Sequence, residues 1–203
     1  NLKAPADSPQ IMMAWKVPKL DPKKMDDVEP YALEVLSAAL SGHDNSRLNR
    51  ELVRNKRLAN NAGASYDLIS RGPELFVISA TAAKGQTVID LEKGILQSIQ
   101  EIADKGITEA ELKRIKAQLL ASQIYKRDSI FAQAMEIGSS EIAYVSWREI
   151  DRMIERVQLI NSEQIKNVVK KFFIQDGLTV VTLDPQPRTM LANPKSSPSG
   201  LRH

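Results

Sequence analysis

The sequence predicts an α+β domain in which a mainly antiparallel sheet is covered by helices. Two observations predict this fold class. Short apolar stretches typical of buried strands occur early, in the middle and near the end of the chain, and the stretches between them repeat apolar residues at helical spacing. With 203 residues, of which 42% are hydrophobic and 26% charged, the chain is long enough to form a packed core.

The N-terminal stretch contains the first predicted strand. Residues 1–10 are polar and contain proline, so we interpret them as a lead-in. Residues 11–17 (IMMAWKV) form a short apolar run that Pro18 stops, which is typical of a buried strand. Residues 18–29 are rich in turn-forming residues and are expected to connect this strand to the first helix.

Two helices are expected next. The first begins near Asp26 or Asp27, because acidic residues favour a helix N-terminus, and Pro30 then lies in its first turn. Gly42 is expected to end it. A second helix is predicted from residue 45 or 46 to residue 57, with apolar residues on one face.

A β-hairpin follows. Residues 62–69 and 74–82 are predicted strands, and residues 70–73 (SRGP) form the turn between them.

The rest of the chain is mostly helical and ends in one strand. The first expected helix is capped by Thr87 and ended by Gly106, and the second has a Thr108/Glu111 capping box and reaches Arg127. A third helix is expected over about 129–144. The fourth has a Ser146/Glu149 capping box, and the fifth is capped by Ser162.

The C-terminal part contains the last predicted strand, residues 178–183 (LTVVTL), which Asp184-Pro185 stops. Residues 1–185 are therefore expected to form one domain. Residues 186–203, which are polar and rich in proline and serine, are expected to form a tail or linker.

The residues needed for self-contained hydrolytic chemistry are missing from the sequence. The chain has no cysteine and only two histidines, His43 and His203, and neither H-E-x-x-H nor H-x-x-E-H occurs. No G-x-S-x-G turn or phosphate-binding glycine motif is present. We therefore expect no catalytic residue, no metal ligand set and no bound cofactor in this chain.

A basic cluster lies in the predicted second helix, and its residues are Arg47, Arg50, Arg54, Lys56 and Arg57. It could form a nucleic-acid face, which would bind in a strongly salt-dependent way. However, aromatic residues make up 5% of the chain and no nucleic-acid motif accompanies the cluster, so we favour a solvated helix face and expect no nucleic-acid partner. No apolar run is long enough to span a membrane.

Several segments resemble the pitrilysin/insulinase family of zinc metallopeptidases, which includes the mitochondrial processing peptidases. Residues 41–52 (SGHDNSRLNREL) are similar to that family's glycine-rich turn, S-R-L and E-L run, and residues 56–59 (KRLA) are similar to its K-x-x-L-A-Y stretch. Residues 107–112 (ITEAEL) resemble its helix start, and a late Ser162 before a helix and closing strand also fits.

This resemblance implies a half-domain of the processing-peptidase type. In that family two such halves enclose a peptide, and one of them holds zinc through H-x-x-E-H. The present chain resembles the other, inactive half. It is expected to bind peptide and enclose the chamber, while a catalytic domain or subunit of the same fold supplies zinc. The alternative is a structural or assembly subunit of the same fold without a role in cleavage.

The resemblance also implies a substrate-binding arginine and tyrosine, spaced R-x-x-x-x-x-x-Y. Aligned on residues 58–59, this chain has Asn60 at the tyrosine position and Val53 at the arginine position, with Arg54 one step away.

The candidate substrate-binding residues are therefore Arg54, Arg57, Asn60 and Tyr66, with either arginine substituting for the family's arginine and Tyr66 for its tyrosine. The sequence leaves the compartment open, and both the periplasm and the cytoplasm of a bacterium fit.

Overall fold

The computed structural model describes residues 1–187. Of the predicted tail, residues 188–203 lie outside the described part, and Gln186 is the last residue of a strand.

One sheet of five strands forms the base of the described domain, in the order β1-β5-β2-β4-β3. The strands are β1 (Leu2–Pro5), β2 (Gln10–Val17), β3 (Ala59–Ser65), β4 (Glu74–Ala82) and β5 (Leu178–Gln186). Only the β1–β5 pair is parallel, and the other neighbours are antiparallel. The prediction of a mainly antiparallel sheet is therefore confirmed.

Three strand predictions need correction. The last strand does not end before Asp184-Pro185, because both residues lie within β5, which runs to Gln186. Residues 1–10 are not only a lead-in, because β1 pairs with β5 along the sheet edge, an interaction that a short polar stretch does not reveal. The strand predicted at 62–69 instead spans Ala59–Ser65. Leu68 and Ile69 lie in the connection to β4, yet they pack against the core from there, and the Leu68 carbonyl accepts a hydrogen bond from Leu20.

Alternation along the strands assigns one face of the sheet to the core. In β2 the buried residues are Ile11, Met13, Trp15 and Val17, while the residues between them point to the other face. The Trp15 ring lies 4.9 Å from that of Phe173, centroid to centroid. This apolar face requires a covering layer, which the helices supply.

Helix α1 (Val28–Ser41) confirms the prediction for the first helix. Asp27 is its N-cap, with a side chain that accepts a hydrogen bond from the Glu29 N–H, and Gly42 is its C-cap. The second predicted helix is present as η1 (Asn49–Asn55), which has π-helical geometry. Its Lys56 N–H bonds to the carbonyl of Glu51, five residues earlier.

Five longer helices follow β4. They are α2 (Val88–Lys105), α3 (Glu109–Lys126), α4 (Ile130–Ile142), α5 (Ile150–Leu159) and α6 (Ser162–Phe172). Short 3-10 turns η2 (Trp147–Glu149) and η3 (Gln175–Gly177) precede α5 and β5.

Three predicted caps differ in the structure. Thr108 caps α3, but the Glu111 side chain binds Arg47 instead of closing a capping box. Ser146 accepts a hydrogen bond from Arg148 in a 3-10 turn, so no Ser146/Glu149 box forms. Asn161 caps α6, because Ser162 uses its hydroxyl oxygen to accept the Ile107 N–H at 2.8 Å.

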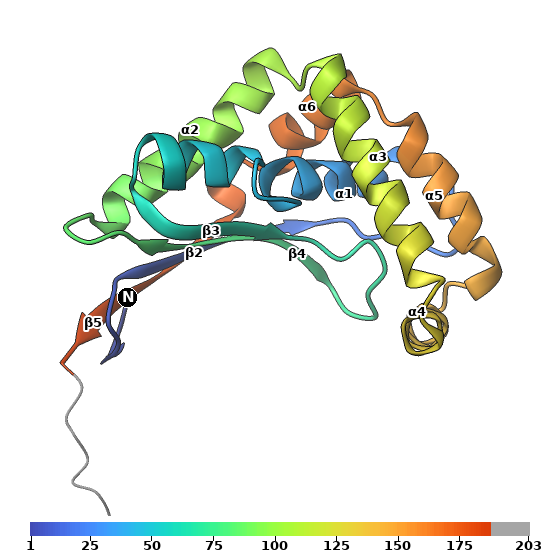
Figure 1. Ribbon diagram of the computed structural model, residues 1–203, viewed down its shortest axis with the longest axis horizontal. Coiled ribbons are helices and arrows are strands. Elements are labelled where there is room, and N and C mark those ends of the chain that lie inside the picture. The colour runs from blue at the N-terminus through green and yellow to red at the C-terminus, as the bar shows by residue number, and fades with distance from the viewer. Residues whose placement is uncertain (188–203) are drawn as a thin grey trace, which may run out of the picture.

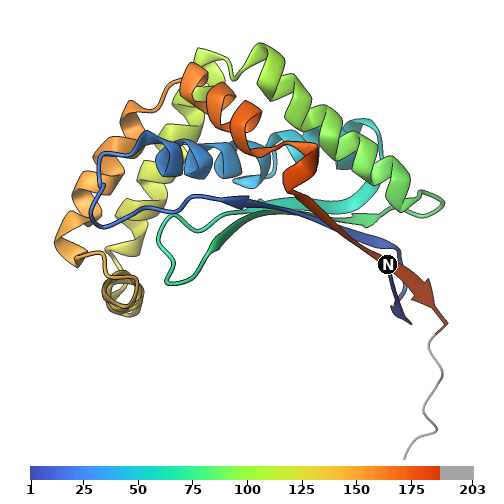
Figure 2. The same ribbon diagram turned by 180° about the vertical axis from the view of Figure 1, so that it is seen from behind.

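The helices cover one face of the sheet only (Figures 1 and 2). Helices α1, α2 and α6 lie across the sheet, whereas α3 and α5 pack beside α1, and α4 lies at the far end of the layer. The sheet curves beneath this layer, and its other face is free of helices.

Candidate functional site

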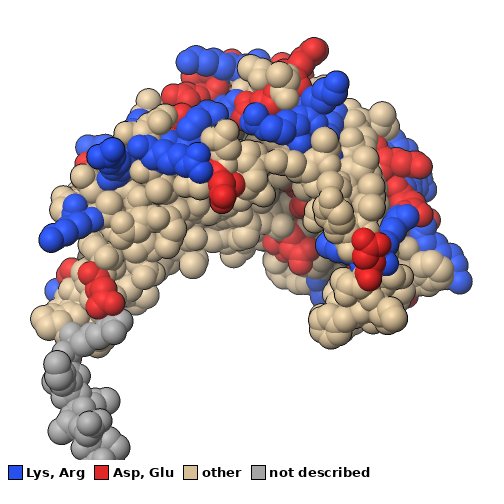
Figure 3. Space-filling model, viewed as in Figure 1, with Lys and Arg blue, Asp and Glu red and all other residues tan. Residues whose placement is uncertain are grey.

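The helix-free face of the sheet is concave and uncharged over three rows of facing side chains. The strand register places these rows side by side. They are Leu183, Gln10, Thr81 and Asn61; Val181, Met12, Ser79 and Gly63; and Thr179, Ala14, Val77 and Ser65. Met12 is 47% exposed and Val181 38% exposed. Figure 3 shows this face as a hollow between β5 and α4 in which few charged side chains are visible.

Arg54 and Arg57 lie at the end of η1 and are both exposed. The Arg54 guanidinium is 3.5 Å from the Asn45 side-chain oxygen. Arg57 has φ 51°, a left-handed conformation that turns the chain from η1 toward β3. Both side chains are therefore accessible to a partner.

Asn60 occupies an irregularity at the start of β3. Ala59 pairs with Ala82 and Asn61 with Thr81, so Asn60 has no partner in the register. Its side-chain amide donates a hydrogen bond to the Ala82 carbonyl at 3.2 Å. This bond stabilises the irregularity, while the residue itself is exposed.

Tyr66 follows the last residue of β3 and is turned inward. Its hydroxyl donates to the Pro18 carbonyl at 2.8 Å, and its ring stacks on Phe76 with centroids 6.1 Å apart. Burial raises the pKa of the hydroxyl, and the neighbouring carboxylates, led by Glu34, raise it further. Tyr66 thus combines a packing role with a place in the wall of the cleft described next.

The four sequence-predicted residues do not form one cluster. Arg54, Arg57 and Asn60 lie near the start of β3, and Tyr66 lies just beyond its end. Asn60 and Tyr66 are six positions apart along an extended chain, which corresponds to about 20 Å. The two arginines therefore do not pair with Tyr66 across a short gap.

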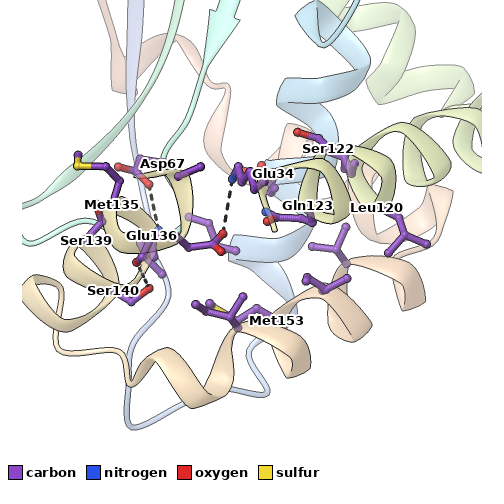
Figure 4. Close-up of a pocket in the computed structure, with 18 of the residues that line it drawn as sticks. Glu34, Asp67, Leu120, Ser122, Gln123, Met135, Glu136, Ser139, Ser140 and Met153 are labelled. Carbon is purple, nitrogen blue, oxygen red and sulfur yellow. Dashed lines mark hydrogen bonds and ion pairs between the residues drawn. The ribbon is translucent and has the colours of Figure 1, made fainter. Parts of the chain in front are cut away.

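A cleft of about 580 Å³ lies between α1, the β3–β4 connection, α3, α4 and α5. Its walls are mostly apolar, but Glu34, Asp67, Lys126 and Glu136 also line it. Figure 4 shows Glu34 from α1, Gln123 from α3 and Glu136 from α4 around the same space. Sequence reasoning missed this cleft, although Glu34 is the only charged residue between positions 30 and 42.

Glu34 is the most perturbed carboxyl group of the cleft. Burial raises its pKa to about 7; the negative charge of Asp67 raises it and the positive charge of Lys126 lowers it. Among the described residues its carboxyl group makes no hydrogen bond. A carboxyl group near half-ionisation at neutral pH responds strongly to an incoming charge.

The described residues do not offer a ligand set for a catalytic metal. Within residues 1–187 no three histidine, cysteine, aspartate or glutamate side chains are grouped closely enough to hold an ion. His43 belongs to a local turn, in which its Nδ1 accepts a hydrogen bond from the Asn45 N–H at 2.9 Å. His203 lies outside the described residues. No helix in residues 1–187 has the length and apolar character of a membrane span.

The basic cluster at 47–57 is not a uniform solvated face. Arg47 points into the protein, where its side chain is 12% exposed and forms an ion pair with Glu111. Arg50 pairs with Glu51 at 3.0 Å, and the Lys56 amine donates to Gln97 at 2.8 Å. The expectation of a solvated face is therefore wrong for Arg47.

Solved structures with low sequence identity share the fold of this chain. The chain superposes with a TM-score of 0.81 on a protease from Helicobacter pylori, at 22% identity, covering 90% of this chain and 43% of that one. It also superposes with a TM-score of 0.76 on the inactive peptidase domain of a putative zinc protease from Bordetella parapertussis, at 16% identity, covering 95% and 98% of the two chains. The fold is that of a metallopeptidase half-domain.

The sequence then defines the family. A family model described as the peptidase M16 inactive domain matches residues 2–119, so the chain belongs to that family. An uncharacterized zinc protease from Mycobacterium tuberculosis is 26% identical over 140 residues, which is 69% of this chain and 32% of the relative. The chain thus spans about a third of the length of this curated relative.

Proposed function

We propose that this domain is the non-catalytic half of a zinc endopeptidase, and that its helix-free sheet face forms one wall of a chamber that holds a peptide. A catalytic H-x-x-E-H half of the same fold would supply zinc and the activated water. The observation that carries the proposal is the concave, uncharged face of the sheet. In this chain, a member of an inactive-domain family, that face lies opposite the helices and is not covered by them.

Physical reasoning supports this division of roles. Hydrolysis needs a metal-activated water and stabilisation of developing charge, both of which a single half can provide. A second half that closes over the peptide excludes water and fixes the position of the substrate. An uncharged wall suits this role because it can cover a peptide backbone without burying unpaired charge.

The start of β3 is a second proposed contact. Arg54, Arg57 and Asn60 are exposed there, and β3 is an edge strand that pairs only with β4 among the described strands. The two guanidinium groups could bind peptide carbonyl or carboxylate oxygens, since arginine is a strong donor to such groups. Tyr66 is assigned to a different region, the wall of the cleft.

Reconstitution tests the proposal. The purified chain alone should bind no stoichiometric zinc by atomic absorption and should not cleave a fluorogenic peptide in an EDTA-sensitive way. Mixing it with its matching H-x-x-E-H half should produce EDTA-sensitive cleavage. Robust cleavage by the chain alone would contradict the proposal.

A matched pair of variants tests the sheet face itself. Met12→Glu adds a charge to the concave face, whereas Ile89→Glu adds one to α2 on the helix-covered side, where Ile89 is 59% exposed. We expect Met12→Glu to lower kcat/KM of the reconstituted enzyme by about tenfold, or ~1.4 kcal/mol, and Ile89→Glu to leave it unchanged. Equal kinetics for both variants would instead favour a structural or assembly role without a part in cleavage.

A further inference from the structure

The cleft beside α4 has the composition of a site for a cation. Three carboxyl groups line it, from Glu34 on α1, Asp67 on the β3–β4 connection and Glu136 on α4, against the single amine of Lys126 on α3. Figure 3 shows acidic side chains set back in the hollow beside α4. The excess of negative charge is local, since the whole chain has a net charge of +3.

Lys126 is already engaged within the cleft. Its amine lies 3.6 Å from a Glu136 oxygen. With the Gln123 amide oriented to suit both neighbours, its NH₂ group donates to Glu136 at 2.9 Å and its oxygen accepts from Lys126 at 3.3 Å. Glu136 therefore has two partners, and the carboxyl group left without a hydrogen bond among the described residues is that of Glu34.

Exposed apolar side chains also line the cleft. Phe131 and Met135 of α4 line it and are 76% and 55% exposed, and Leu120 of α3, also in the lining, is 38% exposed. Large apolar side chains at this exposure lose contact with water when an aliphatic chain covers them. Lysine and arginine side chains combine such an aliphatic stem with a cationic end.

We propose that this cleft binds the lysine or arginine side chain of a peptide, with the stem against Phe131 and Met135 and the cationic group beside Glu34 and Asp67. The inference rests on the proposed function, because it names a class of peptide that the domain would hold. It assigns that recognition to the helical end of the domain, away from the start of β3. The cation would replace the missing partner of Glu34, and a carboxylate paired with a cation forms a strong hydrogen bond.

A direct binding experiment on the whole 203-residue chain tests the inference without a catalytic half. The probes are two fluorescein-labelled alanine-flanked pentapeptides that carry either lysine or norleucine at the centre. Norleucine retains the aliphatic stem and lacks the amine. At pH 8 we expect the lysine peptide to bind at least tenfold more tightly by fluorescence anisotropy.

Three variants locate the site. Glu34→Gln should remove the preference for lysine over norleucine. The matched control Glu109→Gln removes one negative charge from the exposed start of α3, about 20 Å from the cleft along the helix, and should retain the preference. Phe131→Ala should weaken both peptides by a similar factor, since it shortens only the apolar wall.

The pH dependence gives an independent readout. A cation beside Glu34 favours its ionised form, so binding should release protons and the lysine peptide should bind more tightly at pH 8 than at pH 6. Equal affinity for the two peptides, or an unchanged preference in Glu34→Gln, would overturn the inference. Such a result would not affect the reconstitution test of the proposed function. If reconstitution failed but the chain still bound the lysine peptide selectively, only the endopeptidase role would be overturned.

Discussion

Arg47 and Glu111 form a two-pronged ion pair that joins the segment before η1 to the start of α3. The Arg47 Nε donates to one Glu111 oxygen at 2.9 Å, and a terminal nitrogen donates to the other at 2.7 Å. The same terminal nitrogen also donates to the Gly106 carbonyl at 3.2 Å. The two side chains are only 12% and 14% exposed, so the pair lies in a largely dry environment.

Removing one partner of this pair should destabilise the domain. Arg47→Ala leaves the Glu111 carboxylate buried without its cation, which we expect to cost about 3 kcal/mol in the free energy of unfolding. Arg47→Lys should recover only part of this loss, because an amine cannot donate two parallel hydrogen bonds. Urea denaturation followed by circular dichroism measures both. A loss below about 1 kcal/mol in Arg47→Ala would show that the pair is solvated.

The raised pKa of Glu34 should make the folded domain less stable as the pH increases. This pKa is about 7 in the folded chain, because of burial and then Asp67, against an ordinary value of 4.5. Below pH 4.5 both states are protonated and there is no cost. Between pH 4.5 and 7 the folded state keeps a proton that the unfolded state has lost, so the free energy of unfolding falls. Above pH 7 the cost is complete, on the order of 3 kcal/mol.

Glu34→Gln removes this titration. The stability of the variant relative to the unmodified chain should therefore rise as pH increases from 5 to 7 and level off above that. The groups that face the same region are Asp67, Lys126, Glu136 and the Tyr66 hydroxyl. Asp67→Asn should shift the pH-dependent loss of stability to lower pH, because it removes the negative charge that adds to burial in raising the Glu34 pKa. Urea midpoints measured across this pH range provide the check, and parallel profiles would refute the assignment.

Gly106 and Gly85 form a matched pair for testing close packing at the end of α2. Both have positive φ, 72° and 82°. A Cβ on Gly106 would collide with the Ser162 hydroxyl oxygen, whereas one on Gly85 would meet nothing within 4 Å. Gly106→Ala should also displace the Ser162 acceptor from the Ile107 N–H.

We therefore expect Gly106→Ala to cost about 3 kcal/mol and Gly85→Ala about 1 kcal/mol, because only the first adds a collision and a lost hydrogen bond to backbone strain. Thermal and urea unfolding give the two values. Equal costs would mean that strain alone dominates at both positions.

Substitutions of Arg54 and Tyr66 should affect different properties, peptide turnover for Arg54 and the free energy of unfolding for Tyr66. Arg54→Ala removes an exposed side chain and should lower peptide turnover without changing the free energy of unfolding. Tyr66→Phe removes the hydrogen bond to the Pro18 carbonyl, so it should cost about 1 kcal/mol in stability. Kinetics and urea denaturation on each variant test this separation, and unchanged kinetics in Arg54→Ala would remove it from the proposed contact.

Local pattern predicted much of the fold. The capping of α1 by Asp27, the alternation of β2 and the order of elements all follow from interactions between residues close in sequence. The errors have a common cause, which is competition from distant partners. Ser162 was expected to cap its own helix, but its oxygen accepts the Ile107 N–H, and Glu111 was expected to complete a capping box, but its carboxylate binds Arg47.

The candidate site was less predictable for the same reason. Asn60 and Tyr66 are six positions apart in sequence, yet one is exposed at the start of β3 and the other is packed inside beyond its end. The cleft is built from five separate segments, so no spacing within one segment could reveal it.

The sequence by itself determined that the two histidines of this chain, His43 and His203, are too far apart for a two-histidine zinc motif, and that its apolar periods require one helix-covered sheet. Only the tertiary structure decided which face of that sheet stays open, and that Glu34 meets Asp67 and Lys126 in one cleft. The physical reason is that periodicity fixes which side of each element is apolar, whereas burial and charge at a site depend on which elements pack together.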